Sequence, residues 1–380
     1  MLSEVVLLRT SRFPSLETVY NNLNRCMEML GGIDHFVPKG SKVLLKPNIG
    51  SVARPEEARN TDPKIIEGII ILLREAGIGE ITIAESSIVG SDTSAAFEEM
   101  GLDKISKRHN VRLVDLKKEP FIKKIVPESL VLPYIKLSAI VDEIDIFINL
   151  PKLKTIFAVP ISLGLKNLKG LLPDVEKKRF HHTMLAKAII DLNKVVKTNL
   201  TIIDGLVSSE LYEPKETNCL IAGSDVLAVD AVTTRAIGLN PAEIEYLRLA
   251  EEAGIGILDL KKINVLGEPL SEIRLDLKLA PDRSEAFSNL FPEVEIIDGE
   301  ACSGCVASLY LSLKMVRSKG IMDKITGFKI VLGLGVEKIP SDEKVLCIGN
   351  CAKKLQGRYF LPGCPFTYMD FSDYLEKYLS

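Results

Sequence analysis

The sequence predicts an α/β fold with two lobes: a large amino-terminal lobe with mostly parallel sheets covered by helices, and a smaller carboxyl-terminal α/β lobe. Short β-branched runs alternate with helical patterns from the start of the chain. Several of these runs are apolar throughout, as suits a sheet that is covered on both faces. Five of the seven cysteines lie in the last 79 residues, beyond a stretch without clear periodicity.

The large lobe contains short apolar runs that read as strands and longer segments with apolar residues at helical spacing. Strands are expected at residues 5–8, 41–46, 81–84, 145–150, 200–203, 219–222, 263–266 and 273–277. Helices are expected at residues 16–30, 61–77, 185–196, 227–237 and 241–253. Pro63 favours the start of the second helix, because proline is accepted in the first turn. The strand at 219–222 and the helix that follows it are interpreted as a further βα unit.

Residues 281–295 are polar and aromatic without a clear period, so we expect a boundary there. The predicted domains are residues 1–280, which would bind a substrate or cofactor, and residues 296–380, which carry the clustered cysteines. In the second domain we expect a helix after Cys305, strands at 328–332 and 344–348, and a last helix at 367–379.

Charge and hydropathy exclude two classes of partner. The formal net charge of −3 argues against general nucleic-acid binding, which usually requires a net-basic domain. The chain begins without a basic leader, and no apolar run approaches the length of a membrane span. We therefore expect a cytoplasmic protein with neither nucleic acid nor membrane as a partner.

The cysteines are the strongest chemical signal. Cys302 and Cys305 are separated by two small residues, so both thiolates can reach one metal or cluster. Cys351 follows an apolar strand closely, and Cys364 lies between glycine and proline in a turn. These four residues are predicted to hold a metal centre. Cys347 lies inside the apolar strand and is interpreted as core, with the role of substitute ligand if Cys351 does not serve.

Two metal centres fit this pattern. A structural zinc site is one, although zinc knuckles usually have two close Cys-x-x-Cys pairs and these cysteines are more widely spaced. The other is a 4Fe–4S cluster. The chain has a Cys-x-x-Cys turn at 302–305, a Gly-x-Cys motif at 349–351 and a Gly-Cys-Pro turn at 363–365. In this order the three motifs resemble the proximal-cluster site of nickel-iron hydrogenase small subunits and the related subunit of respiratory NADH dehydrogenase. That resemblance covers residues 296–380 and implies a 4Fe–4S cluster on a flavodoxin-like lobe. Phe366 departs from it, because a second proline is frequent there.

Lysines mark a second candidate site in the large lobe. Lys46 and Lys152 each stand at the end of an apolar strand, where open α/β sheets form ligand sites. A charge between Leu45 and Pro47 needs a reason, so Lys46 is a candidate catalytic residue. The residues expected to bind an anionic small molecule or cofactor, such as a carboxylate or phosphate, are Asn48, Lys152, Lys154, Lys166, Asn167 and Lys169.

Histidines and aspartates complete this candidate site. His181 and His182 are two of four histidines, precede a helix expected near Met184, and are candidates for acid–base catalysis. Asp204 follows a strand at a position typical of binding sites. Asp225 precedes a helix and is either a ligand-binding residue or only its N-cap. Asp230 lies within an apolar helix, so it needs a buried partner or a ligand.

The large lobe resembles the DUF362 family, whose uncharacterised members are often described as iron–sulfur-associated. The resemblance rests on Leu45-Lys46-Pro47-Asn48, Asn60-Thr61-Asp62-Pro63, Asn149-Leu150-Pro151-Lys152, Gly164 to Gly170, Phe180-His181-His182, Ile203-Asp204-Gly205 and Gly223 to Asp230. The family supplies no reaction, and neither a dinucleotide-binding nor a phosphate-loop motif is present.

Three functions remain open. The leading hypothesis is an iron–sulfur redox protein, either an oxidoreductase or an electron-transfer protein, whose cluster exchanges electrons with an anionic substrate or cofactor in the large lobe or with a redox partner protein. The second is a non-redox isomerase or lyase, since the lobe looks similar in organisation to nickel-dependent lactate racemase; His181 or His182 would then abstract a proton and the cluster would be structural. The third is a non-catalytic carrier of metal or electrons.

Overall fold

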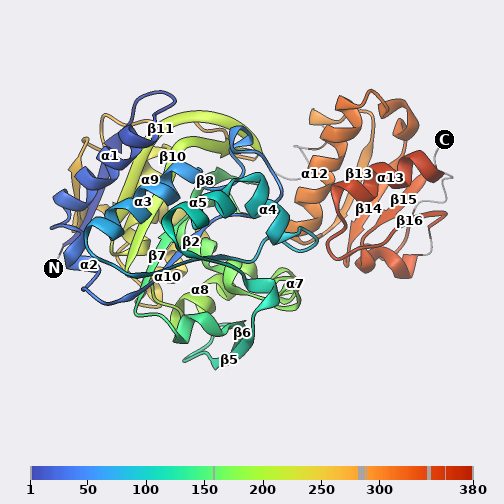
Figure 1. Cartoon of the computed structure of the whole chain (residues 1–380). Coiled ribbons are helices and arrows are strands. Elements are labelled where there is room, and N and C mark those ends of the chain that lie inside the picture. The colour runs from blue at the N-terminus through green and yellow to red at the C-terminus, as the bar shows by residue number, and fades with distance from the viewer. Residues whose placement is uncertain are drawn as a thin grey trace. The chain divides into compact units, whose positions relative to one another are not determined.

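A computed structural model describes residues 2–156, 159–280, 287, 289–339, 344–355 and 357–378. The chain forms two compact units (Figure 1). The first, called the large unit, consists of Met1–Thr155 and Ile161–Lys278. The second, called the small unit, consists of Leu279–Ser380 together with Ile156–Pro160.

The large unit is built on one mixed sheet, in which ten strands are described and most neighbours are parallel. The order is β12-β1-β11-β10-β7-β2-β3-β4, with β8 paired to β10 and β9 paired to β8. The strands are β1 (Ser3–Arg9), β2 (Lys42–Pro47), β3 (Glu80–Glu85), β4 (Arg112–Asp115), β7 (Ile146–Leu150), β8 (Lys152–Thr155), β9 (Ile161–Ser162), β10 (Leu200–Glu210), β11 (Glu213–Gly223) and β12 (Ile263–Gly267).

Helices cover this sheet, and an antiparallel hairpin of β5 (Phe121–Ile125) and β6 (Tyr134–Ser138) lies apart from it. The helices are α1 (Leu16–Met29), α2 (Ile33–Phe36), α3 (Pro63–Glu75), α4 (Thr93–Glu99), α5 (Leu102–His109), α6 (Gly164–Asn167), α7 (Asp174–His182), α8 (Leu185–Val195), α9 (Val226–Ala236) and α10 (Glu245–Glu252). None of the described helices is both long enough and apolar enough to cross a bilayer.

The small unit has its own sheet, in the order β13-β14-β15-β16. All described neighbours in it are parallel. The strands are β13 (Glu295–Gly299), β14 (Lys329–Gly333), β15 (Val345–Ile348) and β16 (Tyr359–Leu361), and the helices are α12 (Ser303–Ser318) and α13 (Tyr368–Tyr378). The predicted α/β fold class, with one large and one smaller sheet, is confirmed.

Two local expectations were wrong. The strand at 219–222 is the end of β11, which pairs antiparallel with β10 and β1 and therefore belongs to a hairpin rather than to a parallel βα unit. Residues 273–277 form no strand; Ile273, Leu275 and Leu277 are buried in an extended segment that pairs with no described strand. The expectation that the histidine pair precedes a helix starting near Met184 is confirmed, since α8 begins at Leu185 with Met184 as its N-cap; the two histidines are also the last residues of α7.

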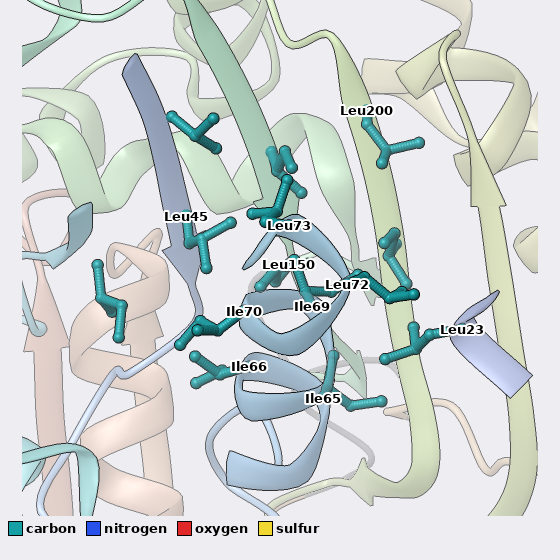
Figure 2. Packing of buried hydrophobic residues seen from close by; sticks show 14 of the residues in the cluster. Leu23, Leu45, Ile65, Ile66, Ile69, Ile70, Leu72, Leu73, Leu150 and Leu200 are labelled. Carbon is teal, nitrogen blue, oxygen red and sulfur yellow. The ribbon is translucent and has the colours of Figure 1, made fainter. Parts of the chain in front are cut away.

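Alternation along the central strands separates two hydrophobic cores. Val43 and Leu45 of β2 belong to the core under α1 and α3, whereas Leu44 belongs to the core under α7 and α8. Figure 2 shows Ile66, Ile69 and Ile70 of α3 pointing toward the strands that carry Leu45 and Leu150. Lys46 follows Leu45, so its side chain shares the face of Leu44.

Helix α3 begins where local chemistry dictates. Asp62 is its N-cap and accepts a hydrogen bond from the Lys64 N–H, and Pro63 occupies the first turn. Thr61, just before it, donates to the carbonyl of Leu150 at 2.7 Å and accepts from the Asn48 N–H at 2.8 Å. The helix start is thereby tied to the carboxyl ends of β2 and β7.

We predict that Ile69→Ala lowers the free energy of unfolding by about 2–5 kcal/mol, because Ile69 is fully buried between α3 and the sheet and truncation leaves a cavity. Ile125→Ala is the matched control, since Ile125 is 70% exposed. Urea denaturation of both variants measures the difference. Equal losses in the two variants would contradict the packing described.

Candidate functional site

A buried ion pair lies where β2 and β3 end. The Lys46 Nζ is 2.8 Å from Glu85 Oε2, and both side chains are almost completely shielded from solvent. The ammonium also donates to the Pro47 carbonyl at 3.1 Å. Burial lowers the pKa of Lys46, and the Glu85 carboxylate opposes that shift. Lys46 is therefore a paired charge inside the protein.

Gly170, in the loop after α6, packs directly against the Lys46–Glu85 ion pair. A Cβ at Gly170 would lie 1.7 Å from Glu85 Oε1 and 2.6 Å from Lys46 Nζ, so no larger residue fits. The Gly170 carbonyl accepts a hydrogen bond from the Ser86 N–H at 3.0 Å. Backbone contact at this point holds the short 3-10 helix η4 (Leu168–Leu171) against the end of β3.

Three asparagines connect the strand ends to the same loop. The Asn167 amide donates to Asn149 Oδ1 at 2.8 Å and to the Lys46 carbonyl at 3.3 Å. Asn149 in turn donates to the Gly164 carbonyl at 3.0 Å, and Asn48 donates to Asn167 Oδ1 at 3.1 Å. Asn48 and Asn167, two predicted binding residues, thus lie together.

A second buried ion pair joins β8 to β10. Lys152 Nζ lies 2.8 Å from Asp204 Oδ2, and neither side chain is more than 2% exposed. Asp204 also accepts from the Asp62 N–H at 2.7 Å. Burial and the neighbouring Asp204 carboxylate raise the pKa of Asp62. The predicted residues Lys152 and Asp204 therefore contact each other directly.

Three further lysines form a group that we call the amine cluster: Lys154 in β8, Lys166 in α6 and Lys169 in η4. The Lys154 Nζ donates to Asn48 Oδ1 at 2.5 Å. Burial and then the charge of Lys152 lower the pKa of Lys154 to about 7, against a weaker opposing effect of Glu85. Burial and the charges of Lys169 and Lys154 lower the pKa of Lys166 well below its ordinary value.

His181 lies beside this cluster, at the end of α7. Its Nε2 is 3.3 Å from Lys169 Nζ. Burial lowers the pKa of His181 well below its ordinary value, and the charges of Lys169 and Lys166 add to that effect. The imidazole is therefore neutral at pH 7. His182, the other predicted histidine, is exposed at the helix end.

Two aspartates of the candidate site accept hydrogen bonds from backbone N–H groups rather than from lysine side chains. Asp230, fully buried in α9, accepts hydrogen bonds from the Gly164 N–H at 2.8 Å and the Leu165 N–H at 3.0 Å, and burial raises its pKa to about 7. It therefore fixes the start of α6. Asp225 is the N-cap of α9 and accepts from the N–H groups of Leu227 and Ala228.

Some polar residues at this site were not anticipated. Glu85 lies one residue beyond the run expected as a strand, and its acidic character at a strand end was the available signal. Lys177 in α7 is buried and donates to the Ser86 carbonyl, to Ser86 Oγ and to the Ser87 carbonyl at 2.8, 2.6 and 2.5 Å. Burial lowers its pKa to about 7. Only the fold brings α7 to this strand end.

The cysteines of the small unit lie at one edge of its sheet. Cys302 follows the end of β13 at Gly299, Cys351 follows the end of β15 at Ile348, and Cys364 follows the end of β16 at Leu361. Each cysteine is the third residue beyond its strand. Because the strands are parallel, these carboxyl ends share one edge of the sheet.

A side-chain hydrogen bond joins two of these thiols, and a third lies near them. A hydrogen bond with Cys302, followed by burial, raises the pKa of Cys305, and Cys351 is close enough to add to that effect. A Cβ at Gly349 would lie 3.5 Å from Cys305 Sγ, so this glycine leaves room beside the thiol. Among the described residues, no group of three or more His, Cys, Asp or Glu side chains is arranged to hold a single metal ion.

Cys347 points elsewhere. It is fully buried in β15 within a small hydrophobic cluster that includes Val331 and Val345. Its Sγ is 2.7 Å from where a Cβ at Gly357 would lie. Cys26 and Cys219, the two cysteines of the large unit, are likewise buried.

Sequence comparison places the large unit among known proteins. A family model described as "Domain of unknown function (DUF362)" matches residues 43–235, just over half of the chain. The chain belongs to the DUF362 family. The matched region includes Lys46, the amine cluster and Asp230, but ends before the cysteines.

Individual relatives are more distant. The chain is 29% identical over 266 residues to the thylakoid-associated protein sll1697 of Synechocystis sp., a match that covers 67% of this chain and 81% of the relative. It is 27% identical over 155 residues to a 3-phosphoshikimate 1-carboxyvinyltransferase of Xylella fastidiosa, covering 38% of this chain and 31% of that enzyme.

One solved structure is also similar: the lactate racemase apoprotein from Thermoanaerobacterium thermosaccharolyticum. It matches with a TM-score of 0.40 and 13% sequence identity. The match covers 58% of this chain and 54% of the racemase.

We predict that Lys46→Met lowers the free energy of unfolding by about 3–5 kcal/mol, because it leaves the Glu85 carboxylate buried without a partner. Adding Glu85→Gln should recover part of that loss, since the remaining charge is then removed. Arg12→Met is the control, because the Arg12–Glu216 pair is exposed and its loss should be undetectable. Chemical denaturation of the four proteins tests this, and a Lys46→Met variant as stable as the parent would contradict it.

Proposed function

We propose that this DUF362 protein is an iron–sulfur redox protein with two sites. A 4Fe–4S cluster would be bound by Cys302, Cys305, Cys351 and Cys364 of the small unit. An anionic substrate or cofactor would be bound by the amine cluster of the large unit. The observation that carries the proposal is the common spacing of three cysteines beyond three parallel strands.

The donor set fits such a cluster. Cysteine thiolates are the usual ligands of 4Fe–4S clusters. Cys302 is the N-cap of α12, and the partial positive charge at a helix N-terminus stabilises thiolates. The glycines at 304 and 349 keep side chains away from the thiols; a Cβ at Gly304 would lie 3.2 Å from Pro365 Cγ and 3.8 Å from Cys302 Sγ. When bound, the cluster would supply one-electron transfer.

The amine cluster supports the second half of the proposal. Lys154 and Lys166 carry amines that burial and neighbouring lysines disfavour as cations, and an anion among them would reverse that penalty. Asn48 adds an amide within hydrogen-bond reach of Lys154. A carboxylate or phosphate matches this set, because both accept several charge-assisted hydrogen bonds.

A second candidate function is proton abstraction by a non-redox isomerase or lyase. It is favoured by His181, whose neutral imidazole beside Lys169 can accept a proton. In that case the anion held by the amine cluster would be the substrate, and the metal centre in the small unit would be structural.

We predict that anaerobically purified protein contains about four iron and four sulfide per chain, as a single 4Fe–4S cluster requires. Cys302→Ala and Cys351→Ala should each lose most of the iron and the EPR signal of the reduced protein. Cys347→Ala is the matched control, because this thiol points into a hydrophobic cluster and its loss should leave the iron content unchanged. Stoichiometric zinc without iron would reject the cluster.

We also predict that His181 titrates well below 6.5, the ordinary value for histidine. Lys169→Met should raise the pKa of His181, because it removes the nearest positive charge. Lys197→Met, which changes an exposed lysine, should leave that pKa unchanged. Proton NMR of the imidazole resonances measures each value, and a His181 that titrates normally, or is unaffected by Lys169→Met, would contradict the buried position beside Lys169 on which the second candidate function depends.

A further inference from the structure

Lys166 differs from the other lysines around the site in its contacts. The ammonium groups of Lys46 and Lys152 each contact a carboxylate. Lys154 donates to Asn48, and Lys169 is within hydrogen-bond distance of His181. Within the described part of the chain, the Lys166 Nζ has neither a hydrogen-bond partner nor an ion-pair partner.

The position of Lys166 is nevertheless fixed. It lies in α6, where the N–H groups of the two preceding residues, Gly164 and Leu165, are held by the buried Asp230 carboxylate. The Leu165 carbonyl accepts from Asn193 at 2.9 Å, and the next residue, Asn167, belongs to the asparagine network. The backbone is therefore clamped on both sides while the half-buried amine is left unpaired.

We propose that Lys166 is a nucleophilic amine that forms an imine with the carbonyl group of an anionic ligand, such as a 2-oxo acid. This inference rests on the anion-binding role proposed above for the amine cluster, and it names the chemical class of the ligand. Lys154 and Lys169 would hold the anionic group while the carbonyl carbon meets the Lys166 nitrogen.

The surroundings favour the uncharged, nucleophilic form of this amine. An ammonium in a desolvated place loses hydration, and two neighbouring lysines repel it. Both effects lower the pKa of Lys166, as in enzymes that activate a lysine for imine formation. By contrast, Lys46 has a carboxylate beside it that favours its charged form.

Arg59 strengthens the case for an anionic ligand. Its Nε is buried and has no hydrogen-bond partner among the described residues, while its Nη2 lies 3.5 Å from Glu57 Oε2. Its charge is close enough to lower the pKa of Lys154. A carboxylate or phosphate beside Lys154 would add a negative charge where lysine and arginine charges now meet.

His181 is placed to move the protons that imine formation requires. In the first step the Lys166 nitrogen bonds to the carbonyl carbon as the second carbon–oxygen bond breaks, and neutral His181 passes one proton from this nitrogen to the oxygen, which becomes a hydroxyl. In the second step His181 passes the other nitrogen proton to that hydroxyl, which leaves as water while the carbon–nitrogen double bond forms. The net change is amine plus carbonyl giving imine plus water, so no oxidant or reductant is needed. Lys166 is close enough to His181 to lower its pKa.

Reductive trapping tests the inference on the full-length protein. Pyruvate and glyoxylate, each with sodium cyanoborohydride at pH 7, should give one adduct per chain, which peptide mass spectrometry should locate at Lys166. We expect severalfold more adduct at Lys166 than at the exposed Lys197, because burial and the charges of Lys169 and Lys154 lower the pKa of Lys166 and leave more of it as free amine. Inorganic phosphate should suppress the adduct by competing for the amine cluster.

Two variants serve as controls. Lys166→Arg should abolish the adduct, and Lys197→Arg should leave it unchanged; circular dichroism checks that both are folded. Lys154→Gln should weaken trapping of pyruvate without removing the nucleophile. If Lys166→Arg unfolds, the location of the adduct in the parent protein still decides the question.

Calorimetric titration with pyruvate and with phosphate separates this inference from the proposed function. If either anion binds and trapping gives no adduct at Lys166, the imine inference is wrong and the anion site stands. If neither anion binds and no adduct forms, both fail. Labelling spread evenly over exposed lysines also overturns the inference.

Discussion

The large unit depends on the buried ion pair between Lys46 and Glu85. Two opposite charges out of water are tolerated only when each stays paired, and removal of either partner is costly. The pair also determines the loop above it, because only Gly170 fits against Glu85 and Lys46. Since η4 is held there and α6 is held by Asp230, Lys169 and Lys166 of the amine cluster lie where Glu85 and Asp230 place them.

Lys46 could be recognised from local sequence, but its partner could not. A charge between a buried strand residue and a proline is unusual enough to be noticed. Glu85 lies 39 positions away, and it reaches Lys46 only because β2 and β3 are parallel neighbours. The same applies to Lys177, whose contacts with Ser86 and Ser87 join positions about ninety residues apart. Individual site residues were thus predictable, whereas their pairing required the sheet order.

The fold class could be predicted from the periodicity of apolar residues. The local predictions that were wrong have physical reasons. The strands β10 and β11 are longer than their apolar segments, and the polar residues 213–217 of β11 concealed a hairpin. Residues 273–277 alternate in burial like a strand yet pair with none that is described. The position of the cysteines could be predicted because it depends on local sequence: each of Cys302, Cys351 and Cys364 is the third residue beyond its strand. Their metal, and the role of His181, stay predictions.

The buried lysines of the large unit fall into two groups, which differ in whether a carboxylate or another lysine lies beside the amine. Lys46 and Lys152 are buried in direct contact with carboxylates, which makes them part of the framework. In the amine cluster, burial and the charge of Lys152 lower the pKa of Lys154, and burial with the charges of Lys169 and Lys154 lowers the pKa of Lys166, so the charged forms of these two amines are disfavoured. A carboxylate beside Lys166 would remove that cost. The nearby Asp230 carboxylate instead accepts hydrogen bonds from the backbone of α6. The repulsion between the lysine side chains would therefore be relieved only by a bound anion.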